Sequence, residues 1–334
     1  MWKVSNNLNS EILLTFRNEI STKLFIEFIN FKITEFGNCS FIEYLKSDSI
    51  IFEAKRDLYI YIANKKKKVL FNDLVESFVN QPMSQIVIQF IEYLTQNRKL
   101  DDLDFNISPF DVDPNLYAIF SKFYYELFFN DPNIWHNIGI KEFNRSVFHN
   151  NFKSENKIEV CPYCDIDTII SRGNQLIEHF LPRKNYAYLA MHPFNLMSCC
   201  YSCNGPFGKL INYYNPITSP FNCQIGDMVE FEIDNENKLI YLKKSSITEV
   251  ENFISLLKLR KKYSSKSVFN VVDSKIRNMF KIFYDLESKL GSQIETSELY
   301  KKYLNYKKEP LTFATKSVIS DINQYEKYRL SRIN

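Results

Sequence analysis

Glycine and proline are scarce in this sequence, and their scarcity excludes several common architectures. Only 7 of the 334 residues are glycine and 11 are proline, whereas glycine alone makes up about 7% of an average protein. Dinucleotide-binding folds, P-loops and barrels with glycine corners all need glycines at fixed places. Neither GxGxxG nor GxxxxGK followed by Ser or Thr occurs. We therefore expect no phosphate-cradling loop in this chain.

Long apolar runs and an export signal are also missing. No segment reaches the roughly 18 to 20 apolar residues that a bilayer span needs, and the N-terminus has no basic stretch followed by an apolar run. The cysteine count, 7, is odd. In a long chain of this kind, clustered thiols bind metal more often than they form disulfides. We expect a cytoplasmic protein that makes no membrane contact.

Bulky aromatic residues are abundant: 29 Phe, 21 Tyr and 2 Trp. With so few turn residues, this composition predicts a mostly helical protein around large aromatic cores. We predict three regions: a helical region over 1–150, a loop-rich module over 151–222 that holds five of the seven cysteines, and a region over 223–334 with a β-hairpin and basic helices. The alternation of β-forming residues over 228–242 predicts the hairpin. The fold class is thus mostly α with a small α+β module.

Apolar spacing of three to four residues predicts helices in the first region, each with one buried face. The predicted faces are Leu13, Phe16, Ile20, Leu24 and Phe28 after a Ser10 cap; Met83, Val87, Phe90, Ile91 and Leu94; and Leu116, Ile119, Phe120, Phe123 and Leu127 after the cap and first-turn pair Asp113-Pro114.

Positive charge is concentrated toward the C-terminus. Residues 223–334 carry 20 Lys and Arg against 15 Asp and Glu, although the net charge of the whole chain is only +3. The run Lys258, Arg260, Lys261 and Lys262 could track a nucleic-acid backbone, and a solvated helix surface is the alternative.

Four cysteines have the spacing of a structural zinc site. Cys161 and Cys164 form one CxxC pair, and Cys200 and Cys203 form a second one, with 35 residues between the two pairs. Two residues between thiolates allow one tight turn to present both sulfurs to the same tetrahedral ion. Cys199 is a substitute ligand that would change the second spacing to CxxxC, so we favour Cys200. Four thiolates leave no open position for water, so this zinc would be structural and not catalytic.

Between and beside the cysteine pairs lie residues of the types that take part in catalysis. An acid and a histidine, Glu178-His179, precede Pro182; Asn195-Leu196 follows; and Asn204 comes directly after Cys203. This order, over about residues 158–216, resembles the HNH endonucleases, whose ββα-metal core stands on a zinc-knuckle scaffold.

The resemblance implies a phosphodiester hydrolase. His179 would be the general base that activates water, and Glu178 and Asn204 would offer hard oxygen ligands to a catalytic Mg²⁺ or Mn²⁺. Asn195 would be the middle asparagine, which orders the loop or orients the base. Family members commonly have Asp where this chain has Glu178, so its part in binding metal stays open.

Two basic residues and one histidine near the motif have open roles. Arg183 and Lys184 follow the motif strand and would either grip a phosphate of the substrate or belong to a solvated loop. His192 lies outside the motif, and we interpret it as a loop residue.

Within the family, the chain looks most like the HNH subunits of Septu-type and retron-associated anti-phage systems. The phrases that carry this likeness are EHFLPR and NLMSCCYSCN. The likeness implies DNA as the substrate, with RNA as the alternative, and an ABC-type ATPase as a partner in a hetero-oligomeric complex. Two other hypotheses stay open: a zinc-knuckle module that binds nucleic acid or a partner without catalysis, and an inactive nuclease-like scaffold subunit.

Overall fold

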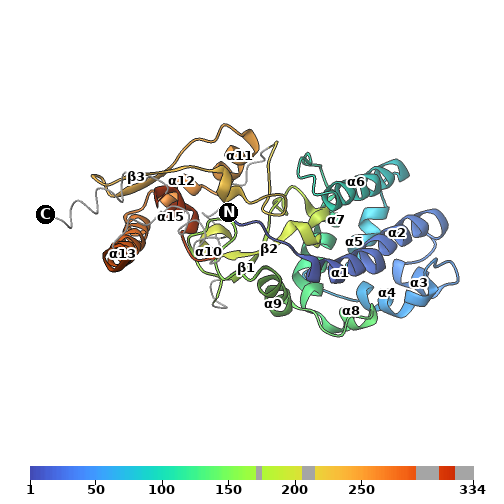
Figure 1. Cartoon of the computed structure of the whole chain (residues 1–334). Coiled ribbons are helices and arrows are strands. Elements are labelled where there is room, and N and C mark those ends of the chain that lie inside the picture. Colours follow the sequence, from blue (N-terminus) through green and yellow to red (C-terminus); the bar gives the residue numbers. More distant parts are fainter. Residues whose placement is uncertain (171–174, 205–214, 291–307, 320–334) are drawn as a thin grey trace. The chain divides into compact units, whose positions relative to one another are not determined.

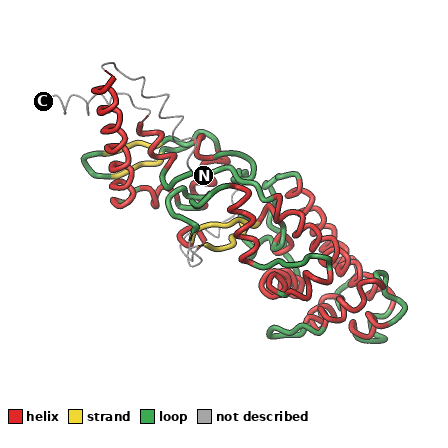
Figure 2. Tube along the Cα trace, turned by 60° about the horizontal axis from the view of Figure 1, so that its bottom comes forward, coloured by secondary structure: helices red, strands yellow, loops and turns green. Residues whose placement is uncertain are grey.

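The computed structural model describes residues 1–170, 175–204, 215–290 and 308–319. It is mostly helical (59%), with two small antiparallel two-stranded sheets. Helices in red dominate the trace in Figure 2, and the strands are the two short yellow pairs. The predicted mostly helical class with a small β component is confirmed.

The chain divides into two compact units. One comprises residues 5–155 and 177–197, and we call it the helical unit; the other comprises 1–4, 156–176 and 198–334, and we call it the cysteine unit. The predicted module 151–222 is therefore shared between the units. The reason is hydrophobic: within 177–197, apolar side chains such as Tyr188 and Leu196 belong to the core of the N-terminal helices.

The helical unit contains most of the helices, coloured blue to green in Figure 1. In chain order they are α1 (Asn7–Phe16), the π-helix η1 (Arg17–Thr22), α2 (Lys23–Thr34), α3 (Phe41–Lys46), η2 (Glu53–Lys55), α4 (Arg56–Ala63), α5 (Phe71–Val79), α6 (Met83–Asp101), α7 (Pro114–Ala118), the π-helix η3 (Ile119–Leu127), η4 (Phe128–Asn130), α8 (Pro132–Asn137) and α9 (Arg145–Asn156), whose last residue passes into the other unit. The short 3₁₀ helices η6 (Ala187–Leu189) and η7 (Pro193–Asn195) complete the unit.

The first predicted helical face is confirmed. All five predicted residues, from Leu13 to Phe28, are buried along α1, η1 and α2. The predicted cap Ser10 is wrong, because the helix begins at Asn7. The Glu155 carboxylate accepts hydrogen bonds from the backbone N–H groups of Asn7 and Leu8, at 2.9 and 3.2 Å. An outside carboxylate thus satisfies donors that a capping side chain would otherwise serve.

The second predicted face is wrong in three of its five residues, although the helix itself is present as α6. Met83 and Phe90 are partly buried and pack against the core. Val87, Ile91 and Leu94 are exposed, and the helix instead buries Gln89, Gln96 and Asn97 among apolar side chains. Gln89 explains the rotation: its amide donates to the Asp111 carbonyl at 3.1 Å and accepts from the Asp113 N–H at 3.3 Å. The buried face of α6 also contains Ile86, Tyr93 and Leu100, and hydrogen bonds to a neighbouring loop satisfy its polar member Gln89.

The third predicted helix is confirmed with its cap. The Asp113 carboxylate accepts from the Asn115 and Leu116 N–H groups, and Pro114 occupies the first turn of α7. Along η3 the predicted residues Ile119, Phe120 and Phe123 are buried. Aromatic rings fill the core of this unit, where the Phe25 ring alone lies near those of Phe28, Phe78, Phe90, Tyr93 and Phe120.

The cysteine unit is smaller in regular structure. Its elements are α10 (Tyr201–Asn204), η8 (Ile225–Met228), β3 (Phe231–Asp234), β4 (Leu239–Leu242), α11 (Thr248–Leu256), α12 (Leu259–Tyr263), α13 (Lys266–Leu290) and α15 (Thr312–Ile319). The predicted hairpin is confirmed: β3 pairs antiparallel with β4 in a register that joins Asp234 to Leu239 and Phe231 to Leu242.

Strands β1 (Gln175–His179) and β2 (Leu196–Cys200) form the other sheet. The boundary between the units runs through both strands. His179 ends β1 in the helical unit, whereas the cysteines of β2 belong to the cysteine unit.

Candidate functional site

The four predicted cysteines form one buried cluster. The Sγ atoms of Cys161, Cys164, Cys200 and Cys203 all lie within 4.8 Å of one another. A tetrahedral shell with Zn–S bonds of about 2.3 Å separates its sulfurs by about 3.8 Å, and the Cys164 and Cys200 sulfurs are 3.8 Å apart. The donor set and its spacing therefore fit a zinc ion, and the predicted four-cysteine group is confirmed as a possible metal centre.

Backbone N–H groups support the sulfurs of this cluster. The Ile166 N–H donates to Cys164 Sγ and the Cys200 N–H donates to Cys161 Sγ, each at 3.4 Å. Such bonds stabilise thiolates, because they place a positive dipole end against each sulfur. The Cys199 side chain is also buried, but its thiol is directed to the Cys200 carbonyl at 3.6 Å and it is not part of the cluster. The choice of Cys200 over Cys199 is confirmed.

Helix α12 places a cation against the cluster. Lys262 Nζ lies 3.1 Å from Cys203 Sγ. Burial lowers the pKa of Lys262, but the neighbouring sulfurs of Cys203 and Cys164 outweigh it and raise the pKa above its ordinary value. Next to it, the Tyr263 hydroxyl donates to the Cys164 carbonyl at 2.7 Å. The helix thus supports the cysteine cluster through both side chains.

The basic run that contains Lys262 does not form a continuous exposed stripe. Arg260 makes two hydrogen bonds to the Glu251 carboxylate, at 2.6 and 2.7 Å. With Lys262 directed to Cys203, two of the four cations have partners inside the unit. These contacts do not favour the hypothesis that the whole run tracks nucleic acid.

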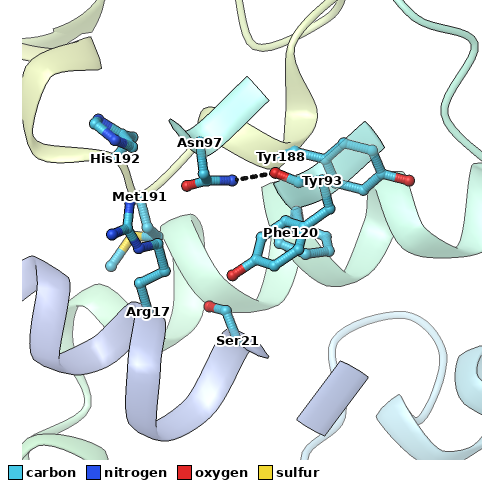
Figure 3. Close-up of a pocket in the computed structure, with 8 residues that line it drawn as sticks. All are labelled: Arg17, Ser21, Tyr93, Asn97, Phe120, Tyr188, Met191 and His192. Atoms are coloured by element: carbon cyan, nitrogen blue, oxygen red, sulfur yellow. Dashed lines mark hydrogen bonds between the residues drawn. The ribbon is translucent and has the colours of Figure 1, made fainter. Parts of the chain in front are cut away.

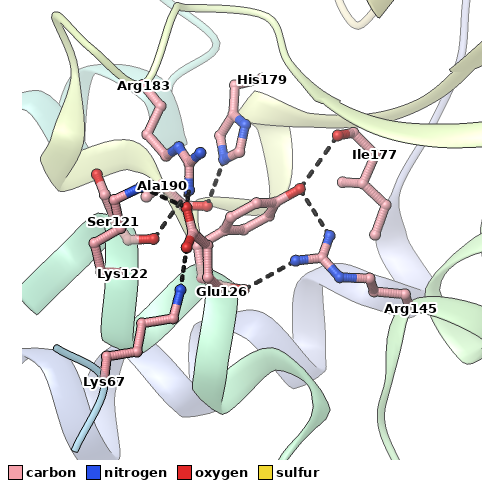
Figure 4. A network of polar contacts seen from close by, with 10 residues as sticks. Lys67, Ser121, Lys122, Glu126, Arg145, Ile177, His179, Arg183 and Ala190 are labelled. Atoms are coloured by element: carbon pink, nitrogen blue, oxygen red, sulfur yellow. Dashed lines mark hydrogen bonds and ion pairs between the residues drawn. The ribbon is translucent and has the colours of Figure 1, made fainter. Parts of the chain in front are cut away.

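Strand β1 presents the predicted acid and base. Glu178 and His179 are both buried, with 9% and 8% of their surfaces exposed. His179 Nε2 lies 3.0 Å from the Ala190 carbonyl oxygen, as the dashed line in Figure 4 shows. Because a carbonyl can only accept, Nε2 carries the proton of the neutral ring and Nδ1 keeps the lone pair. The ring is therefore fixed in the tautomer whose Nδ1 can accept a proton.

Tyr125 packs against the His179 ring, and sequence reasoning missed it. The two rings meet edge to face, with centroids 4.3 Å apart. Arg145 Nη1 donates to the Tyr125 hydroxyl at 2.9 Å, so the hydroxyl gives its own proton to the Ile177 carbonyl, 3.2 Å away. Tyr125 thus holds both the histidine ring and the strand that carries it. Nothing in the sequence separates this tyrosine from the other aromatic residues of its helix.

Asn195 orders the loop between β1 and β2. Its Oδ1 accepts from the Leu181 N–H at 2.7 Å, and its Nδ2 donates to the carbonyls of Leu181 and Leu189 at 3.2 and 3.1 Å. Its backbone carbonyl accepts from the Phe180 N–H at 2.8 Å. The amide is therefore committed to the backbone of the loop that supplies the Ala190 carbonyl to His179.

The Arg183 guanidinium is bound by groups of the protein, although 26% of the side chain stays exposed. Its Nη1 donates to the Ser121 carbonyl at 2.9 Å and to Glu126 Oε1 at 3.1 Å, and its guanidinium lies 4.9 Å from the centre of the Tyr125 ring. Lys184, the other predicted substrate-binding residue, is exposed.

Asn204 belongs to a different unit from the other predicted catalytic residues. It ends α10 directly after the ligand Cys203 and belongs to the cysteine unit. Glu178, His179 and Asn195 belong to the helical unit. Each unit therefore carries part of the predicted constellation: the base with its support in one, and the cysteines with Asn204 in the other.

His192 is a buried structural residue. Its Nε2 lies 3.0 Å from Asp101 Oδ1, and its Nδ1 accepts from the Phe194 N–H at 3.3 Å. Burial lowers its pKa. The hollow beside it, drawn in Figure 3, has room for about one water molecule. It is lined by Arg17, Ser21, Tyr93, Asn97, Phe120, Tyr188, Met191 and His192. Its size excludes a substrate.

None of the helices that the structure describes is long and apolar enough to cross a membrane. Comparisons with protein-family models, with curated proteins and with solved structures find no match to this chain. The functional argument therefore depends on the residues and contacts described above.

Proposed function

We propose that this protein is a metal-dependent endonuclease of the HNH type that hydrolyses phosphodiester bonds in DNA. The observation that carries the proposal is the hydrogen bond from His179 Nε2 to the Ala190 carbonyl, at 3.0 Å. It leaves Nδ1 as the basic nitrogen, which is what a general base for water activation needs. The four-cysteine cluster would hold a structural zinc ion with all four of its ligands and would supply no catalytic chemistry.

Hydrolysis begins with proton transfer from water to His179 Nδ1. The Tyr125 ring and the Asn195 amide hold the histidine and its loop in place, so the base needs little reorganisation when it reacts. Arg145 keeps the Tyr125 hydroxyl directed to the β1 backbone. Glu178, the carboxylate beside the base, would offer a ligand to a Mg²⁺ or Mn²⁺ ion, which would offset negative charge on the phosphorane and the leaving oxygen.

We also propose that the protein acts with an ATPase partner in anti-phage defence. The support is the sequence alone: the phrases EHFLPR and NLMSCCYSCN resemble those of nuclease subunits that act with an ATPase. The chain has no P-loop motif, so ATP hydrolysis in such a complex would belong to the other subunit. A pull-down of the tagged chain from cells that also express its neighbouring genes tests this part, and ATPase activity in the recovered complex is the expected result.

The nuclease proposal is tested with zinc-loaded protein on plasmid DNA. Wild type is expected to cut when Mg²⁺ or Mn²⁺ is added, and His179→Ala is expected to lose roughly 10² to 10⁴ in rate, as enzymes do without their base. The matched control is His136→Ala, since His136 is exposed on α8. Cutting by His179→Ala at the wild-type rate would refute the assignment. Binding of DNA by wild type without any cutting would favour the non-catalytic zinc-knuckle alternative.

A further inference from the structure

We propose that a cluster of cations in the helical unit, beside His179, binds the sugar-phosphate backbone of DNA. The cluster, which we call the basic cluster, consists of Lys67, Lys122, Arg145 and Arg183 and is drawn in Figure 4. The inference rests on the proposed nuclease function, because it assigns the surface that would bring a phosphodiester to that site.

Three of these cations surround a single carboxylate. Glu126 Oε1 lies 2.9 Å from Lys122 Nζ and 3.1 Å from an Arg183 nitrogen, and Oε2 is bonded to Lys67. Partial burial acts to raise the pKa of Glu126, but the three cations outweigh it and lower the pKa to about 2. One negative charge is therefore shared among three positive ones.

The fourth cation adds to the excess. Arg145 makes no ion pair within the described residues; it donates to the Tyr125 hydroxyl and carbonyl, and its guanidinium lies over the Tyr125 and Phe129 rings at 4.5 and 5.0 Å. Four positive charges thus stand against the one charge of Glu126. Glu178 is a further acid near Tyr125, and the positive charges still outnumber the negative ones. Such an excess of positive charge attracts a polyanion.

The charges are accessible and already ordered. The side chains of Lys67, Lys122 and Arg183 keep 36%, 46% and 26% of their surface exposed. The tight turn that carries Lys67 is closed by hydrogen bonds from the Phe71 N–H to the Lys65 carbonyl and from the Lys67 N–H to the Val69 carbonyl. Because the donors are held in place before binding, they lose little conformational freedom when they contact phosphates.

The cluster adjoins the candidate base through Tyr125. This ring lies under the guanidinium groups of Arg145 and Arg183 and against the His179 ring, and Glu126 is its neighbour in sequence. A backbone held by these cations would lie next to the His179 ring. The same turn also exposes Lys66 and Lys68, which extend the basic surface.

The first test measures DNA affinity without catalysis. Binding of a fluorescein-labelled DNA duplex is followed by anisotropy over a range of salt concentrations, without added Mg²⁺ or Mn²⁺. In Lys67→Gln/Lys122→Gln, two phosphate contacts are lost, so the salt slope should decrease by about 1.4 to 1.8 and affinity near 0.15 M salt should fall roughly 10- to 30-fold. The matched control is Lys23→Gln/Lys55→Gln, because these lysines share Glu19 in the same unit.

A second variant is expected to change DNA affinity in the opposite direction. Glu126→Gln removes the one negative charge inside the cluster, so it should bind the duplex more tightly than wild type, which a folding defect would not produce. The inference is overturned if the Lys67→Gln/Lys122→Gln protein binds like wild type, if the control loses as much affinity, or if polyglutamate competes as well as unlabelled DNA. Weaker binding by the double variant, together with no cleavage by wild type, would support the surface and refute the nuclease.

Discussion

Each unit has one centre of charged groups, and the two centres differ in the sign of the charge that is in excess. In the cysteine unit, four sulfurs that would carry negative charge around a metal face one cation, Lys262. In the helical unit, one carboxylate, Glu126, faces three cations, and a fourth lies close by. The first centre needs positive charge, and the second has positive charge in excess.

Burial separates the roles of the two centres. All four cysteines are buried, so a metal ion inside the protein would balance the charge of their thiolates. The cations around Glu126 are partly exposed, so a polyanion outside the protein can balance theirs. Under the proposed function, one centre would hold the fold and the other would contact the substrate.

Loss of zinc should have the largest effect on stability, and it should destabilise only the cysteine unit. Structural zinc contributes about 10 to 16 kcal/mol in small metal-bound domains. In Cys164→Ser, we expect hydrogen exchange to lose protection across α11 and α12 while α2 and α5 of the helical unit stay protected. Cys199→Ser is the control, because its buried thiol is outside the cluster. Equal exchange in both variants would contradict a structural metal centre.

Acid should destabilise the helical unit through His149. Burial lowers its pKa to about 4, and the charges of Lys153 and Arg145 add to the effect. Since the unfolded pKa is near 6.5, the unfolded chain takes up the proton first, and stability falls as pH falls from about 6.5 to about 4. At pH 5 the expected loss in the free energy of unfolding is about 2 kcal/mol, measured with urea.

Two controls connect this loss to the positive charge of the helical unit. His149→Gln should remove the contribution of this residue between pH 7.5 and pH 5. Added salt should reduce the loss modestly, because it screens Lys153 and Arg145 but leaves burial, the first cause, unchanged. An identical pH profile in wild type and His149→Gln would show that His149 titrates normally.

Loss of Lys262 should have the smallest of these effects. Residues that support metal ligands typically contribute 10- to 100-fold to metal affinity. Lys262→Met should therefore release zinc to a chromogenic chelator about 10- to 100-fold more readily, whereas Lys262→Arg should keep most of the affinity. Lys261→Met is the control, since Lys261 is exposed on the same helix. If it matches Lys262→Met, the contact with Cys203 has no particular role.

Short sequence patterns predicted the features of this molecule that depend on residues close together in the chain. The CxxC spacing identified the four sulfurs that meet, and the alternation of β-forming residues over 228–242 located the hairpin. The face of α6 was wrong because Gln89 bonds to a loop that is distant in sequence. The support of His179 was missed for a similar reason: Tyr125 reaches the β1 backbone at Ile177, 52 residues later in the chain, and Arg145 in turn bonds to the Tyr125 hydroxyl.

The division of the chain was also beyond local patterns. Residues 177–197 read as part of the cysteine-rich module, yet Tyr188 and Leu196 pack in the aromatic core of the helical unit. A core assembled from distant segments has no signature in the spacing of any one of them.

The most direct test of this account measures binding and cutting on the same protein. Zinc-loaded His179→Ala should bind the labelled duplex with wild-type affinity and salt slope, because the basic cluster is intact. On addition of Mg²⁺ or Mn²⁺ it should cut roughly 10² to 10⁴ times more slowly than wild type. A His179→Ala protein that cuts at the wild-type rate would contradict the account.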